Sequence, residues 1–323
     1  MKKRKIGNVY VNPIGLGCMG FSHAYGPAMD EKEAIKTIQK AYVAGYNFFD
    51  TAECYLGTNQ DGTLSNNEEI VGKALHDVRE KVFIATKFGV KHAADNTLIC
   101  DSRPETIRRS IEGSLKRLNT DYIDLYYQHR IDPNIEPEVV ANTMKELIKE
   151  GKIKAWGISE VNEEYLRRAN QICHVSAIQN RYSMMARWHE PLFKICDELD
   201  IAFVAFSPLA NGFLGGDILN VFPKGDFRNE MPQYHEGLKA GKELLAYLNQ
   251  LAKEKNCTTA QLSLAWMLNK SERIIPIPGS RNIQRIKENM AAADILLSSS
   301  EMKKIDNFLN SMQFFVFGGH KKQ

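Results

Sequence analysis

Short apolar segments alternate with longer stretches of helical periodicity along most of the chain. The apolar segments are rich in β-branched and aromatic residues and are bounded by polar turns, a pattern typical of buried strands. We expect eight strands, at residues 14–18, 46–50, 82–86, 123–128, 154–158, 177–180, 202–206 and 274–277. An earlier segment, residues 4–11, carries Gly7-Asn8 between two short arms and is expected to form a β-hairpin.

Helical periodicity fills the gaps between these strands. The predicted helices are residues 31–44, 67–76, 104–118, 138–150, 163–170, 191–199, 242–255 and 283–290. Before the third of them, Ser102 is expected to cap the helix and Pro104 to occupy its first turn. Gly45 and Gly151 stand where two other helices should end.

Alternating strands and helices predict a parallel sheet built from β-α units. With 323 residues, 43% of them hydrophobic, the chain is long enough for one large barrel. We therefore expect an α/β fold, a single (β/α)8 TIM barrel with an N-terminal β-hairpin, forming one domain over residues 1–323. A doubly wound sheet is the alternative, because Gly15, Gly17 and Gly20 match a Gly-x-Gly-x-x-Gly turn. Gly26-Pro27 follows too soon for the helix that such a turn requires, so we reject this alternative.

Two segments interrupt the alternation. Residues 56–66 and 214–238 are rich in Gly, Asn and Asp, and both are too long for ordinary connections. Each follows a predicted strand, and in a (β/α)8 barrel the loops after strands form the active-site face. We expect residues 56–66 and 217–238 to be long loops at the carboxyl face that could gate a substrate.

Charge and cysteine content argue against several classes of protein. The 42 basic and 39 acidic residues leave a net charge of +3 without a basic cluster, which disfavours nucleic-acid binding. The six cysteines are far apart and are typical of free thiols in a reducing compartment. A basic start is not followed by an apolar stretch, and no apolar run approaches 18 residues. We therefore expect a cytoplasmic protein without membrane association.

Four ionisable residues lie at or just beyond the ends of three successive predicted strands. Asp50 and Tyr55 follow the second strand, Lys87 the third and His129 the fourth. Barrel topology would bring these side chains together. A nearby ammonium stabilises phenolate, so Lys87 is expected to lower the pKa of Tyr55 from about 10 and help it to transfer a proton.

The segments around these residues resemble the catalytic segments of the aldo-keto reductase superfamily. They read Asn-Phe-Phe-Asp-Thr-Ala-Glu-Cys-Tyr (47–55), Ala-Thr-Lys-Phe (85–88) and Tyr-Tyr-Gln-His (126–129), and the similarity runs from residue 14 to residue 289. The resemblance implies that Tyr55 is the general acid and that Lys87 tunes it. It implies further that Asp50 holds Lys87 and that His129 orients the carbonyl group.

A metal-dependent barrel hydrolase is the competing class of enzyme. It would place several His, Asp or Glu residues at strand ends with the spacing of metal ligands. The histidines outside the site, among them His92, His174, His189, His235 and His320, show no such spacing and are interpreted as surface residues. We predict no metal site.

A strand, a small-residue turn and a helix start come together at residues 275–289. Hydroxyl and guanidinium donors near the start of a helix favour binding of an anion. The segment is similar to the adenosine-phosphate site of the same superfamily, and two arginines favour NADP(H) over NAD(H) because a guanidinium matches a phosphate dianion. The residues implied at this site are Gly279, Ser280, Arg281, Arg285, Glu288 and Asn289.

The resemblance also implies contacts with the rest of the cofactor. Ser159 and Gln179 would hold the nicotinamide carboxamide, and Phe206 would stack on its ring. Glu160 stands where the family usually has asparagine, so one carboxamide contact is not expected here. Further implied cofactor contacts are Gly17, Met19, Asp50, Ser207, Pro208, Leu209 and Gly212.

The expected function is NADPH-dependent, reversible reduction of aldehydes or ketones to alcohols, with a small-molecule substrate and possible homo-oligomers. The length of the segment 217–238 resembles the longer family members that act on aldehydes. Tyr25, Phe88 and Trp188 are expected to make the pocket apolar. The alternative is an NADP(H)-sensing regulatory subunit resembling the potassium-channel β subunits, which keep this fold.

Overall fold

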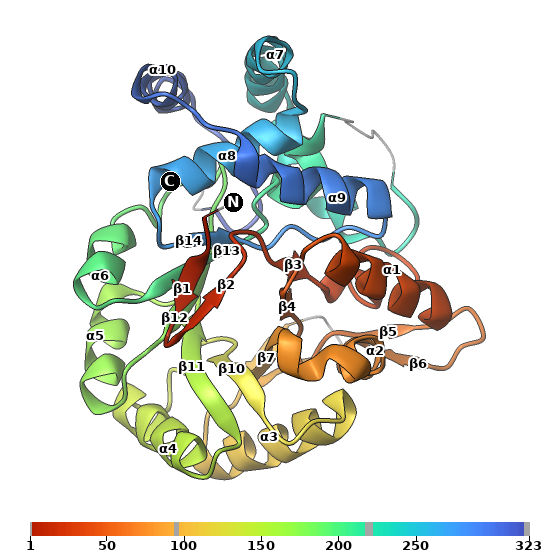
Figure 1. Ribbon diagram of the computed structural model, residues 1–323, viewed down its shortest axis with the longest axis vertical. Helices are drawn as coiled ribbons and strands as arrows, with labels where there is room; N and C mark the ends of the chain where they lie inside the picture. Colours follow the sequence, from red (N-terminus) through yellow and green to blue (C-terminus); the bar gives the residue numbers. More distant parts are fainter. Residues whose placement is uncertain (1, 94–96, 217–221, 320–323) are drawn as a thin grey trace.

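The computed structural model describes residues 2–93, 97–216 and 222–319. Eight parallel strands form its central sheet, in the same order in space as in sequence (Figure 1). They are β3 (Leu16–Gly17), β4 (Phe48–Asp50), β7 (Phe83–Phe88), β10 (Ile123–Gln128), β11 (Ile153–Ser159), β12 (Ala177–Arg181), β13 (Ala202–Phe206) and β14 (Ile274–Pro276).

Backbone hydrogen bonds join the first strand to the last. The amide of Gly15 donates to the carbonyl of Pro276 at 3.0 Å, and that of Gly17 donates to Pro278 at 3.4 Å. The approach is so close that a Cβ on Gly17 would lie 2.7 Å from the carbonyl oxygen of Ile277. Glycine is therefore needed where the barrel closes, and the predicted (β/α)8 barrel is confirmed.

Helices surround the sheet on its outer side (Figure 1). They are α1 (Glu31–Val43), α2 (Asn67–Leu75), α3 (Pro104–Leu118), α4 (Pro137–Lys149), α5 (Glu163–Ile172), α6 (Leu192–Glu198), α7 (Leu238–Glu254), α8 (Thr259–Lys270), α9 (Ile283–Ala291) and α10 (Ser299–Asn310). Short 3-10 helices are η1 (Met19–Phe21), η2 (His76–Lys81), η3 (Ala210–Gly215), η4 (Phe227–Glu230), η5 (Pro232–Tyr234) and η6 (Ala292–Asp294).

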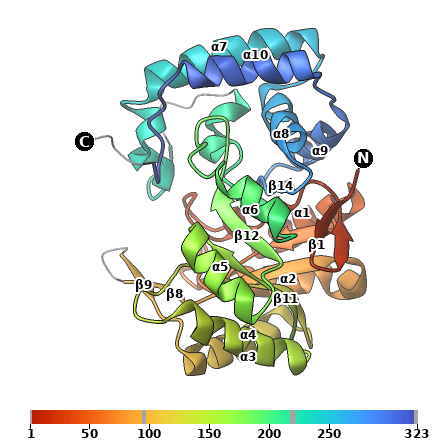
Figure 2. The same ribbon diagram turned by 90° about the vertical axis from the view of Figure 1, so that its left-hand side faces the viewer.

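Two of these helices were not among the predicted elements. Helix α8 is buried along most of its length, so its sequence lacks the alternation of apolar and polar faces that marks a surface helix. Helix α10 begins with a capping box formed by Ser298 and Glu301, which marks its start in the sequence. It packs beside α7 (Figure 2), where the rings of Tyr247 and Phe308 stack at 4.2 Å.

The predicted helix ends are mostly confirmed. Gly45 and Gly151 both have positive φ, at 101° and 77°, just after α1 and α4. Pro104 occupies the first turn of α3, but the expected cap at Ser102 is wrong. The Ser102 hydroxyl instead accepts a hydrogen bond from the Gln128 side chain at 2.9 Å, because it faces the end of β10 rather than the helix amides.

Three insertions follow strands of the barrel, and all lie at its carboxyl face. Residues 56–66, expected to be an irregular loop, form an antiparallel hairpin of β5 (Leu56–Thr58) and β6 (Leu64–Asn66). A second hairpin, β8 (Val90–His92) with β9 (Leu98–Cys100), was not predicted. The third insertion contains η3, η4 and η5, and the part of the predicted loop at residues 217–221 lies outside the described residues.

The opposite end of the barrel is covered by the predicted N-terminal hairpin of β1 (Arg4–Ile6) and β2 (Val9–Val11) (Figure 2). Ile6 and Val11 pack onto the interior of the barrel together with apolar side chains of β4, β7, β10, β12 and β13. A larger apolar core lies between the outer side of the sheet and the helices. Among the helices of the described segments, none has the length and apolar character needed to cross a membrane.

Candidate active site

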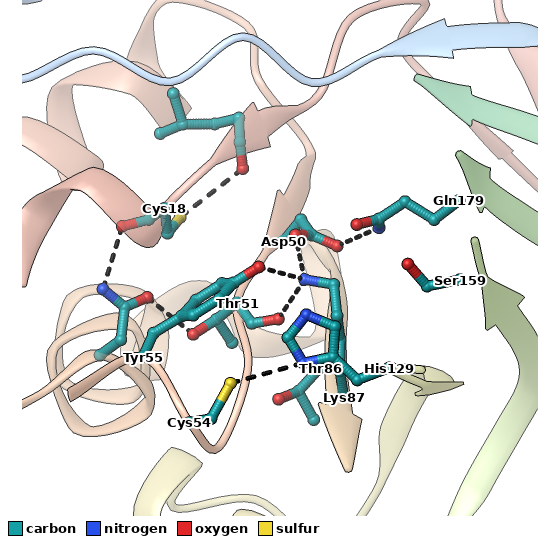
Figure 3. Close-up of polar contacts among 12 residues, drawn as sticks. Cys18, Asp50, Thr51, Cys54, Tyr55, Thr86, Lys87, His129, Ser159 and Gln179 are labelled. Carbon is teal, nitrogen blue, oxygen red and sulfur yellow. Dashed lines mark hydrogen bonds and ion pairs between the residues drawn. The ribbon is translucent and has the colours of Figure 1, made fainter. Parts of the chain in front are cut away.

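Lys87 lies at the centre of a buried polar cluster at the carboxyl end of β7 (Figure 3). Its side chain has no exposed surface, and its ammonium donates to Asp50 Oδ1 at 2.5 Å and to the carbonyl of Thr51 at 2.7 Å. Asp50 ends β4, the neighbouring strand, so the parallel pairing of the two strands places the carboxylate beside the ammonium. Burial lowers the pKa of Lys87, but the nearby Asp50 and Tyr55 outweigh it, and the net shift is upward.

Tyr55 points its hydroxyl into this cluster (Figure 3). The Lys87 ammonium donates to the phenol oxygen at 3.2 Å. Burial raises the pKa of Tyr55 to about 12, while Lys87 acts in the opposite direction. The expected net lowering of the Tyr55 pKa is therefore wrong, because loss of solvation outweighs the favourable charge of Lys87.

His129 follows β10 and completes the group of four predicted catalytic side chains. Its ring lies edge-on to the Tyr55 ring, with the centroids 5.7 Å apart. The Cys54 thiol contacts His129 Nδ1 at 3.4 Å. Burial, with smaller effects from Arg130 and Lys87, holds the pKa of His129 well below its ordinary value. The imidazole is therefore neutral near pH 7, and a hydrogen bond from the thiol to Nδ1 would leave Nε2 as the N–H donor.

Two polar side chains continue the cluster toward the later strands. Gln179, on β12, donates to Asp50 Oδ2 at 2.7 Å. Ser159, at the end of β11, accepts a hydrogen bond from Arg130 Nη1 at 3.1 Å. Both residues are buried and lie side by side next to the catalytic cluster (Figure 3). The structure thus brings together the four predicted catalytic residues and these two predicted cofactor contacts.

The segment after β13 has an unusual backbone. Phe206 ends the strand with its ring partly exposed, and Ser207, Ala210 and Asn211 all have positive φ. Gly212 follows with φ of 98°. Pro208 is buried and Leu209 partly exposed within the same turn. The amides of Ala210 and Gly212 donate to the carbonyls of Ser207 and Leu209 within this turn, at 3.0 Å each. A phosphate group held here would therefore be met by other amides of the turn.

The predicted adenosine-phosphate site lies beside the closure of the barrel. A Cβ on Gly279 would lie 2.7 Å from the carbonyl oxygen of Gly17, so both predicted glycines are required by the close approach. Arg281 donates through Nε to the carbonyl of Gly20 at 2.5 Å, while its buried Nη2 has no hydrogen-bond partner among the described residues. Burial lowers the pKa of the Arg281 guanidinium. An orphaned, buried guanidinium nitrogen fits the recognition of an anion.

The start of α9 differs in one respect from the expectation. Asn282 caps the helix by accepting from the amides of Gln284 and Arg285, so those two amides are already bonded. Ser280 accepts from the Asn282 amide at 3.0 Å. Any anion bound here would therefore be met mainly by side chains. Glu288 and Asn289 lie farther along the same helix, partly and fully buried, and Met19 lies in η1 on the other side of the closure.

Several residues of the site were not identified from the sequence. His23 stacks on Tyr55 with the ring centroids 5.9 Å apart, and His92 lies 5.2 Å from His23. Arg130 and Arg181 also lie at the carboxyl face. The sequence did indicate a place for Arg130 in the site, because it directly follows His129. The expectation that Phe88 lines the pocket is wrong. Its side chain is fully buried against Tyr126 on the helix side of the sheet.

No group of three or more His, Cys, Asp or Glu side chains that could hold a metal ion occurs within residues 2–93, 97–216 and 222–319. The metal-dependent hydrolase considered from the sequence therefore has no ligand set in that part of the chain. The six cysteines are all free thiols, three of them buried.

Comparisons with known proteins agree with this geometry. The aldo/keto reductase family model matches residues 13–310. A relative from Glycine max, named probable aldo-keto reductase 1, is 38% identical over 299 residues, covering 91% of this chain and 84% of the relative. An aldo/keto reductase structure from Klebsiella pneumoniae, in complex with NADP and acetate, has a TM-score of 0.72 at 26% identity and covers 95% of each chain.

A glycerol dehydrogenase structure from Gluconobacter oxydans has a TM-score of 0.85 at 23% identity, covering 99% of this chain and 98% of that one. This likeness supports the fold alone. The family model and the Glycine max relative each span most of the sequence, and the residues matched by the family model include the strand ends that carry Asp50, Lys87 and His129. The chain therefore belongs to the aldo/keto reductase family and is an oxidoreductase.

Proposed function

We propose that the protein reduces an aldehyde or ketone to an alcohol with NADPH and catalyses the reverse reaction with NADP+. The observation that carries this proposal is the buried contact between Lys87, Asp50 and the Tyr55 hydroxyl. A phenol held by an ammonium at the carboxyl end of a barrel can give a proton to an alkoxide and can take it back. The NADP and NADPH complexes of the Klebsiella pneumoniae relatives support the choice of cofactor.

NADPH, when bound, supplies the hydride that reduces the carbonyl carbon. The residues proposed to bind NADPH lie at or beyond the ends of β11, β12, β13 and β14, which are consecutive neighbours in the sheet. This order supports binding of an extended dinucleotide along the carboxyl face. Arg281, with Ser280 and Arg285, would meet the 2′-phosphate, and the turn after β13 would meet the pyrophosphate. Phe206, Ser159 and Gln179 would hold the nicotinamide beside the cluster.

The catalytic roles follow from the contacts. Tyr55 protonates the carbonyl oxygen, since its hydroxyl is the proton-bearing group at the centre of the cluster. Lys87 stabilises the phenolate that remains, and Asp50 fixes the Lys87 ammonium through a buried ion pair. Neutral His129 donates a hydrogen bond from Nε2 to the carbonyl oxygen and polarises it.

The pKa shifts of Tyr55 and His129 predict different pH profiles for reduction and for oxidation. Tyr55 has a pKa of about 12 and His129 has a pKa well below its ordinary value, so neither changes charge between about pH 6.5 and 9. Reduction, which needs the protonated phenol, should have a kcat that is constant over this range. Alcohol oxidation needs the phenolate, and its kcat/KM should rise about tenfold per pH unit.

These profiles can be measured from initial rates in both directions in buffers of constant ionic strength. A reduction rate that falls steeply above about pH 8, or an oxidation rate that levels off there, would mean that the phenol titrates far below the expected pKa.

The preference for NADPH is expected to depend on Arg281. Replacing Arg281 with Met removes the guanidinium whose Nη2 is buried without a partner. The KM for NADPH should rise at least about tenfold, since a charge-assisted hydrogen bond contributes about 1.5–3 kcal/mol. NADH lacks the 2′-phosphate and serves as the internal control in the same assay. An equal rise in KM for both cofactors would show that Arg281 acts only on the local structure.

Product analysis tests the proposed reaction directly. Purified protein incubated with NADPH and benzaldehyde should form benzyl alcohol and NADP+ in equal amounts, quantified by chromatography. NADPH oxidation without the alcohol would contradict carbonyl reduction, because the electrons would then pass to another acceptor.

A further inference from the structure

Arg181 is a buried cation at the carboxyl end of β12, two residues beyond Gln179. Residues two apart on a strand point to the same face, so Arg181 lies one step above the layer that contains Gln179 and Asp50. Only 8% of the residue is exposed. Burial lowers the pKa of its guanidinium to about 10, which leaves it charged at neutral pH.

Within residues 2–93, 97–216 and 222–319, no carboxylate forms a salt bridge with this guanidinium. The guanidinium donates from Nη1 to Asn211 Oδ1 at 3.3 Å. Glu160 accepts a hydrogen bond from the backbone amide of Arg181 at 2.8 Å, and its charge raises the pKa of the guanidinium, but less than burial lowers it. The guanidinium carbon lies over two aromatic rings, 4.9 Å from the centroid of Phe206 and 5.2 Å from that of Phe317.

Among the described residues, the fold supplies this cation with two aromatic rings and one amide oxygen but with no salt bridge. A buried charge without a counter-ion destabilises a protein, because the lost hydration is not replaced. The aromatic contacts of Arg181 would be kept in part by an apolar side chain of similar length. A functional requirement for positive charge accounts for a residue that is unfavourable for folding.

A second cation lies near the same site. Arg130 follows His129 directly and donates to the hydroxyl of Ser159 and to the backbone carbonyl of His129. Within the described segments it makes no salt bridge with a carboxylate. Its charge contributes to lowering the pKa of both His129 and Arg181, which places it close to each. Two cations that form no salt bridge within the described residues therefore lie near the cluster of Tyr55 and His129.

We propose that Arg181 binds an anionic group, a carboxylate or phosphate, on the carbonyl substrate, and that Arg130 adds to the positive potential there. This inference rests on the proposed function and names its substrate class. A phosphate of the cofactor has the same chemistry and is the other source of an anion. Arg181 lies directly above the catalytic layer, and this favours the substrate.

The test compares two aldehydes that share a four-carbon chain, 4-oxobutanoate with its carboxylate and neutral butanal. Wild-type protein should have the higher kcat/KM for 4-oxobutanoate. In Arg181→Met, kcat/KM should fall about 10- to 100-fold more for 4-oxobutanoate than for butanal, as expected for loss of a charge-assisted hydrogen bond. Lys149→Met removes one positive charge from the exposed end of α4 and is the matched control, with no change in the ratio of the two aldehydes.

Each other outcome is informative. Wild-type turnover of butanal without a preference for 4-oxobutanoate, or equal losses in Arg181→Met, would overturn the inference and leave the proposed function standing. Turnover of neither aldehyde would count against the proposed function itself. The Kd of NADPH, measured by its fluorescence, distinguishes an anion of the substrate from a phosphate of the cofactor. If Arg181→Met raises the Kd of NADPH by as large a factor as it lowers kcat/KM for 4-oxobutanoate, the guanidinium binds the cofactor.

Thermal unfolding adds a readout that does not depend on activity. Because Arg181 is buried and forms no salt bridge within the described residues, Arg181→Met should unfold at the same temperature as wild type or at a higher one. A Tm lowered by several degrees would show that the guanidinium stabilises the fold, and would contradict the inference that Arg181 is present to bind an anion.

Discussion

Replacing Tyr55 with Phe is expected to lower kcat for aldehyde reduction by about 10²- to 10⁴-fold, the usual contribution of a general acid. The substitution removes one oxygen atom, which accepts the hydrogen bond from Lys87 at 3.2 Å, and keeps the ring between His23 and His129. NADPH should still bind, since the phenol is not among the proposed cofactor contacts. Steady-state rates and cofactor fluorescence measured on the same preparation separate these two effects.

Tyr247→Phe is the matched control for this substitution. Tyr247 lies on α7, where its ring stacks on Phe308 far along the chain from the cluster. Its loss of a hydroxyl should leave kcat unchanged. A Tyr55→Phe protein that keeps more than about a tenth of wild-type kcat would mean that another group supplies the proton.

The second large effect is expected at Lys87, on both stability and catalysis. Lys87→Met leaves the Asp50 carboxylate buried without its cation, and breaking a buried ion pair in this way costs about 3–5 kcal/mol in free energy of unfolding. The variant should also lose most of its activity, because the phenolate of Tyr55 is no longer stabilised. Urea unfolding measures the first effect and initial rates measure the second.

A double variant distinguishes these two consequences. Lys87→Met combined with Asp50→Asn removes the charge that the single substitution leaves behind, so part of the lost stability should return. Activity should not return with it, because neither the ammonium nor the carboxylate is then present. Recovery of both together would show that the ion pair only maintains the fold.

The catalytic cluster could be predicted from the sequence because strand ends and barrel topology are enough to bring it together. Asp50 and Lys87 end neighbouring parallel strands, and His129 follows the next one, so their convergence does not depend on any loop. The glycines at 15 and 17 also have a simple physical reason, the close contact that closes the barrel. These features depend on the register of the sheet, which the apolar pattern specifies.

Other features depend on contacts between distant parts of the chain and have no local signal. The pKa of Tyr55 is set by burial, which the sequence does not give, and the expected direction was therefore wrong. The hairpin at residues 56–66 lacks the alternating apolar pattern of a strand because its strands are short and lie at the surface. The Arg181 guanidinium packs against Phe317, which lies 136 positions later in the chain.

The central claim is that the cluster reduces a carbonyl group with hydride from NADPH and a proton from Tyr55. Its most direct test is NADPH oxidation, followed at 340 nm, with a panel of aldehydes and ketones for wild type beside Tyr55→Phe and with NADH as a second cofactor. We expect turnover that prefers NADPH and is nearly abolished in Tyr55→Phe. Tight binding of NADPH without turnover of any carbonyl compound would contradict it and would favour a subunit that senses the cofactor.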